Sequence, residues 1–133
     1  MAVFQQALTT LAGERECLPE ALLDGFPELL AVRVRRGGLP PRVAGWCLGT
    51  STVAGITLWR TIWLGKNVYP TAELLLHELR HVHQFESVRA FPLRYLWESL
   101  RHGYHHNRFE VDARQFAHER AGVQREVPLS EGA

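Results

Sequence analysis

Residues 74–86 read LLLHELRHVHQFE and place three histidines and two glutamates in a run that is rich in apolar residues. Polar and charged side chains cost free energy to bury unless they are paired or bound to an ion. The apolar residues recur with the period of an α-helix, and Thr71, which follows Pro70, is suited to cap its N-terminus. We therefore expect a helix from Thr71 to about Glu86 or Ser87 that brings these polar groups to the core for a chemical purpose.

The five residues from 77 to 81 form the pattern H-E-x-x-H. On a helix, residues i and i+4 share a face, so the imidazoles of His77 and His81 can bind one ion while Glu78 lies beside them as a base. A hydrolytic zinc site has three protein ligands and an open position for water, so a third ligand must come from elsewhere. The metzincin class of zinc peptidases is excluded, because it requires glycine and histidine where this chain has Gln84 and Ser87.

Glu110, within NRFEVDARQFA, is the best candidate for the third ligand. It shares a helical stripe with Ala113 and Ala117, whose small side chains would let this helix approach the first one closely. Asp112 lies about 200° around the helix from Glu110 and should face elsewhere. An alternative stays open: with Asn107 as the N-cap, Glu110 would stand at the position that completes a capping box.

Several polar residues near the motif have weaker claims to a role. His83 lies about 200° around the helix from the second histidine of the motif, so we expect a surface group or an outer partner of the ligands. Gln84, His105 and His106 are expected to be solvated, although a hydrogen bond to a ligating imidazole is another option. Arg80 would either crowd the helix that carries the HExxH motif or point to solvent.

At 133 residues, 46% of them hydrophobic, the chain is long enough for one core, and we expect residues 1–133 to form a single domain. Fifteen basic and fourteen acidic residues give a net charge of +1, which does not favour nucleic acid or a membrane surface as a partner. Cys17 and Cys47 lack metal-ligand spacing and are expected to be buried thiols. The longest uncharged stretch, residues 43–59, is interrupted by glycines and is not a membrane span, so a cytoplasmic protein is expected.

The remaining elements are short and are predicted from apolar periodicity and from glycine and proline breaks. In LLAVRVRRGG, residues 29–38, two valines alternate with arginines before a double glycine, which is the pattern of a half-buried strand. We predict two N-terminal helices, over 3–12 and 18–30, the second interrupted at Pro27, and strands over Gly55–Trp59 and Thr61–Leu64 that form a hairpin or one kinked strand. A further helix is predicted over Pro92–His102, with Gly103 at its end and one apolar face formed by Leu93, Leu96, Trp97 and Leu100. The last helix is predicted over Asn107–Arg120, stopping at Gly122, and residues 122–133 are expected to be a frayed tail.

These residues carry a resemblance to a known family. The HExxH motif and the N-x-x-E-x-x-A context of Asn107, Glu110 and Ala113 resemble the gluzincin branch of the zincin metallopeptidases. More narrowly, AGITLWRTIWLGKNVYPTAELLLHELRHVHQ is similar to the compact minigluzincin-type domain of bacterial extracellular contractile injection system core sequences. There, a strand pair leads through a short loop into HEL-x-H-V-x-Q. The resemblance covers roughly residues 30–120.

The resemblance implies a site, a fold and a reaction. His77, His81 and Glu110 would be zinc ligands, and Glu78 the general base that takes a proton from a water whose pKa zinc lowers to about 7. The fold would be α+β and zincin-like: a small twisted sheet, the metal helix under it, and C-terminal helices that deliver the third ligand. A peptide or protein substrate would bind along the edge strand before the metal helix, which corresponds to Thr61–Leu64.

This chain departs from the family at two points. Arg80 occupies a position that is usually small, and no donor to the transition state matches a family motif, since Tyr104, His105 and His106 are merely nearby in sequence. Three hypotheses follow. The first is a zinc-dependent peptidase, the second is a zinc-binding scaffold or binding domain with little or no peptidase activity, and the third is a metal-free helical interaction module in which HExxH is a coincidence. The oligomeric state is not predicted.

Overall fold

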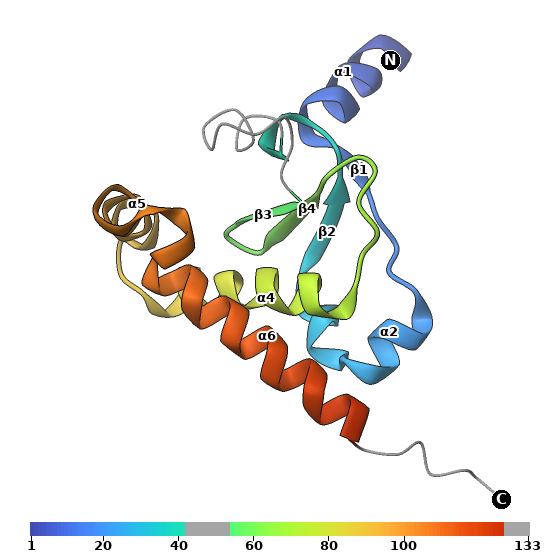
Figure 1. The fold of residues 1–133 in the computed structure, drawn as a ribbon. Helices are drawn as coiled ribbons and strands as arrows, with labels where there is room; N and C mark the ends of the chain where they lie inside the picture. Colours follow the sequence, from blue (N-terminus) through green and yellow to red (C-terminus); the bar gives the residue numbers. More distant parts are fainter. Residues whose placement is uncertain (42–53, 127–133) are drawn as a thin grey trace, which may run out of the picture.

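The computed structural model describes residues 1–41 and 54–126, and it combines helices with a four-stranded sheet, as expected for an α+β protein (Figure 1). The predicted α+β class is therefore confirmed. In chain order the elements are α1 (Ala2–Ala12), β1 (Glu14–Arg15), α2 (Glu20–Gly25), the 3₁₀ helix η1 (Pro27–Ala31), β2 (Arg33–Arg36), β3 (Gly55–Leu58), β4 (Thr61–Leu64), α4 (Ala72–Ser87), α5 (Phe91–His106) and α6 (Arg108–Glu126).

The strands lie in the order β1-β2-β4-β3. β4 is parallel to β2, with Val34 opposite Ile62, and antiparallel to β3, with Thr57 opposite Ile62. The prediction that Thr61–Leu64 is an edge strand is therefore wrong, because β4 is hydrogen-bonded on both sides. Its Ile62 and Leu64 are fully buried, as the interior of a sheet requires. Among the described strands, β1 and β3 take the two edge positions.

Helix α4 packs beneath the sheet, and α6 crosses below α4 (Figure 1). Thr71 caps α4 as predicted, since its hydroxyl accepts a hydrogen bond from the backbone N–H of Leu74 at 3.2 Å. The apolar face of α4 meets the sheet, while three alanines of α6 lie in the buried interior. The core that results contains Phe26, Leu29, Val34, Ile62, Leu64, Leu75, Leu76, Leu79, Val82, Ala117 and Ala121.

The structure refines or corrects other predictions from the sequence. The helix expected over 18–30 divides at Pro27 into α2 and η1. The helix expected over Pro92–His102 does break at Gly103, which has a positive φ of 77°, and a further turn then extends α5 to His106. The thiol of Cys17 is exposed, so the prediction of a buried thiol is wrong there. Cys47 lies outside the described residues. None of the helices in the described part of the chain is long and apolar enough to cross a membrane.

The predicted stop at Gly122 is also wrong, because α6 continues to Glu126. A methyl group at Gly122 would meet no atom within 4 Å. Because alanine is favoured over glycine inside a helix, we expect Gly122→Ala to raise the free energy of unfolding by about 0.5–1 kcal/mol, measured by urea denaturation.

Gly13→Ala provides the contrast. Gly13 has a φ of 75°, and an added methyl would lie 2.7 Å from the carbonyl oxygen of Arg36. This variant should lose more than about 1 kcal/mol of stability. If Gly122→Ala also lost stability, the helix would end at Gly122 as the sequence suggested.

Candidate metal centre

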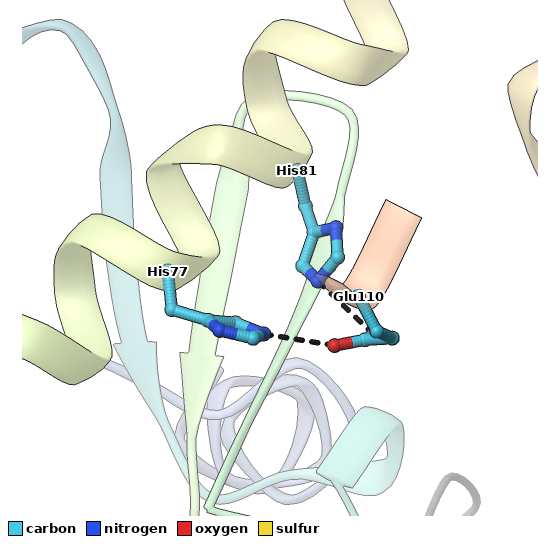
Figure 2. A group of neighbouring side chains, drawn as sticks. All are labelled: His77, His81 and Glu110. Carbon is cyan, nitrogen blue, oxygen red and sulfur yellow. Dashed lines mark hydrogen bonds and ion pairs between the residues drawn. The ribbon is translucent and has the colours of Figure 1, made fainter. Parts of the chain in front are cut away.

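Two imidazoles of α4 lie one helical turn apart and face the same way (Figure 2). The ring centroids of His77 and His81 are 5.0 Å apart, and the rings stand nearly perpendicular. Both side chains are largely buried. The helix therefore arranges them as the H-E-x-x-H spacing predicts.

Glu110 approaches both imidazoles from α6 (Figure 2). Its Oε2 lies 2.9 Å from His77 Nε2, and its Oε1 lies 3.1 Å from His81 Nε2. One ligand atom from each of the three residues lies within 4.8 Å of the others, so the group could hold a metal ion. The predicted set of two histidines and one downstream glutamate is brought together.

The capping alternative for Glu110 is not observed. Asn107 does cap α6, because its Oδ1 accepts a hydrogen bond from the N–H of Phe109 at 2.9 Å. The N–H of Asn107 itself donates to the carbonyl oxygen of Tyr104 rather than to Glu110. The carboxylate of Glu110 is thus available to the imidazoles.

The charges of the group are strongly coupled. Burial disfavours the charged form of Glu110, but hydrogen bonds from His77 and His81 outweigh burial and hold its pKa well below the ordinary range. Burial likewise disfavours protonated His81, but the hydrogen bond with Glu110 and the charges of Glu78 and Glu110 raise its pKa to about 9. The site therefore keeps a buried carboxylate ionised and attracts positive charge. A divalent metal ion meets that requirement, with release of the proton from His81 Nε2.

Gln84 fixes the orientation of the His81 imidazole, although a solvated side chain was expected from the sequence. Its Nε2 donates to the carbonyl oxygen of Phe109 and to Asp112 Oδ2, each at 3.0 Å. Its Oε1 must therefore accept from His81 Nδ1, which lies 2.8 Å away. With Nδ1 held protonated by Gln84, loss of the Nε2 proton would leave the lone pair of Nε2 free to bind a metal ion. Gln84 thus acts as an outer partner of a ligating imidazole, the alternative that the sequence left open.

Arg80 neither crowds the metal group, by which we mean the side chains of His77, His81 and Glu110, nor extends freely into solvent. Its Nε donates to Asp112 Oδ2 at 2.8 Å, and its guanidinium lies 5.0 Å from the ring centroid of Phe116. Asp112, which was expected to face elsewhere than Glu110, also contacts α4, but through Arg80 and Gln84 rather than through the two imidazoles. The ring of His83 also stacks edge-on against Phe116, so it is not a ligand in this arrangement. These contacts join α4 to α6 beside the metal group.

The carboxylate of Glu78 is held against strand β3. Thr57 Oγ1 lies 2.7 Å from Glu78 Oε2, to which its hydroxyl donates. A methyl group at Gly55 on the same strand would lie 3.2 Å from Glu78 Oε1, so glycine leaves room for the carboxylate. Glu78 is 5% exposed. Strand β3 therefore orients Glu78, the candidate base. The edge of β3 that faces away from β4 pairs with no other described strand.

Two tyrosines of α5 were not assigned a role by the sequence analysis. Tyr95 donates its hydroxyl to Glu110 Oε1 at 2.6 Å. Tyr104 follows the break at Gly103, and burial raises the pKa of its hydroxyl, as do the charges of Glu110 and Glu78. Tyr104 therefore stays protonated at neutral pH and can donate a hydrogen bond. No sequence motif identifies either residue, because their positions in the site depend on how α5 packs against the helix that carries Glu110.

No protein-family model matches this chain, and no curated protein or solved structure is similar to it. The resemblance to the gluzincins therefore remains a prediction from the motif.

Gln84→Leu tests whether the outer hydrogen bond supports metal binding. Leucine retains much of the volume but cannot accept from His81 Nδ1, so the ring loses its fixed tautomer. We expect metal affinity to fall about 10- to 100-fold, measured by competition with a chromophoric chelator. Gln115→Leu, on the exposed side of α6, is the matched control and should bind as wild type does. Equal affinity in the two variants would contradict the role given to Gln84.

Proposed function

We propose that this chain is a zinc-dependent peptidase of the gluzincin type. The observation that supports this most directly is the convergence of His77, His81 and Glu110, with Glu78 next to the first ligand on the same helix. Two imidazole nitrogens and one carboxylate oxygen are a donor set that suits zinc and leaves a fourth position for water or substrate. When bound, zinc would activate that water and polarise the carbonyl of the scissile bond.

The residues of the chain would handle the protons of the reaction. Glu78 would take a proton from the attacking water and return it to the leaving amine, and Thr57 would keep its carboxylate in place. Tyr104, whose hydroxyl keeps its proton, would donate a hydrogen bond to the substrate oxygen as negative charge develops there. Tyr95 would hold Glu110 without touching the substrate.

The substrate we propose is an extended peptide that pairs with β3. In the described part of the chain, β3 is bonded to β4 on one side and leaves its other edge without a strand partner. Main-chain hydrogen bonds along such an edge bind a peptide by strand addition, with little dependence on its side chains. This replaces β4, which was expected to bind the substrate and lies inside the sheet. The contact of Thr57 with Glu78 would place the bound peptide beside the base.

A second candidate is a zinc-binding scaffold without peptidase activity. The burial of Glu78 and its hydrogen bond with Thr57 favour it, because a buried and occupied carboxylate is less accessible to water. Both candidates require zinc, and they differ only in whether Glu78 acts on a substrate.

Zinc binding is the first test. The purified chain without a histidine tag should contain about one zinc ion, measured by plasma emission spectrometry. Glu110→Ala should lose zinc, since it removes one of three ligands. His118→Ala, at an exposed position of α6, is the control and should retain it. A wild-type chain that takes up no zinc on addition would contradict both candidate functions.

Peptide hydrolysis separates the two candidates. Glu78→Gln should keep its zinc and lose at least about 100-fold in the rate of peptide cleavage, because general-base catalysis contributes that much. Cleavage products of a peptide library can be followed by mass spectrometry. Glu86→Gln changes an exposed glutamate of the same helix and should leave cleavage unchanged. A zinc-loaded wild type that cleaves no peptide would support the scaffold instead.

A further inference from the structure

Helix α5 carries an apolar stripe that the described part of the protein leaves uncovered. Leu93, Leu96, Trp97 and Leu100 are each between 58% and 82% exposed. At about 100° per residue, these four positions span about 100° of the helix circumference. The opposite side of α5 holds buried Phe91, so the stripe points away from the body. The helix itself lies at the periphery of the molecule (Figure 1).

Positive charge borders this stripe. Arg94 and Arg101 fall next to each other along one side of it, and the guanidinium of Arg101 lies 5.8 Å from the ring centroid of Trp97. Neither arginine forms an ion pair with any described residue. The acidic residue of the helix, Glu98, is turned inward, where its Oε1 lies 3.6 Å from Arg108 Nε. The exposed face of α5 is therefore apolar and basic, without acidic side chains.

We propose that α5 binds the surface of an anionic phospholipid bilayer, with the helix axis parallel to the membrane plane. Leucines would enter the boundary between headgroups and acyl chains, and Trp97 would lie at the headgroup level, where its ring and N–H are both accommodated. Arg94 and Arg101 would contact lipid phosphates. The surface charge is local, which is why the net charge of +1 gave no sign of it.

A second copy of the chain fits this face less well. In a two-fold antiparallel helix pair, each border of the stripe meets the same border of the other copy. Arg94 and Arg101 would then oppose one another across the pair, with no acidic side chain between them. An anionic surface instead satisfies both arginines and covers the leucines. The inference does not depend on zinc or on peptidase activity.

Co-sedimentation with vesicles tests the proposal on the full chain. We expect binding to vesicles that contain phosphatidylglycerol, little binding to phosphatidylcholine alone, and release at high salt. Each arginine near such a surface contributes roughly fivefold to partitioning, so Arg94→Gln with Arg101→Gln should weaken binding more than about tenfold. Leu96→Ser with Leu100→Ser should weaken it at least as much.

Matched variants control for exposure and charge elsewhere. Phe4→Ser changes an exposed apolar residue of α1, and Arg33→Gln changes an exposed arginine of β2. Both should bind vesicles as wild type does, and circular dichroism should show that every variant is folded. The proposal is overturned if wild type binds neither vesicle type, if the α5 variants bind as tightly as wild type, or if light scattering shows a dimer that Leu96→Ser with Leu100→Ser dissociates.

Discussion

The close packing of α4 against α6 is the contact on which the metal group depends. Ala113, Ala117 and Ala121 are nearly or fully inaccessible, and their small side chains allow the two helices to approach. This approach brings the carboxylate of Glu110 within hydrogen-bond distance of His77 and His81. Larger side chains at these three alanine positions would push α6 away from α4. The buried carboxylate of Glu110 would then lose its partners, at a high cost in free energy.

A polar network holds this arrangement in one geometry. Gln84 links an imidazole of α4 to the first turn of α6, and Tyr95 links α5 to Glu110. Asn107, which is fully buried, caps α6 and donates to the carbonyl oxygen of Tyr95. Among the described residues, every buried side-chain nitrogen and oxygen has a hydrogen-bond partner. A fully satisfied network is what preorganises a site, because any displaced member would leave another unpaired.

The sequence predicted the three candidate ligands, including Glu110 on a second helix, but it missed most of the side chains that surround them. His77 and His81 follow from helical periodicity, and Glu110 follows from the small residues on its stripe. Gln84 looked like a solvent-facing residue because nothing in the sequence says that α6 covers it. Thr61–Leu64 was mistaken for an edge strand because the parallel pairing of β4 with β2 joins segments distant in sequence. Tyr95 went unnoticed because its partner lies on another helix.

The proposed function requires the three converging side chains to bind one zinc ion. Crystals of the chain grown with one equivalent of zinc, measured on both sides of the zinc absorption edge, test this directly. We expect one strong anomalous peak between His77 Nε2, His81 Nε2 and the carboxylate of Glu110. Zinc bound elsewhere, with Glu110 still hydrogen-bonded to both imidazoles, would contradict it.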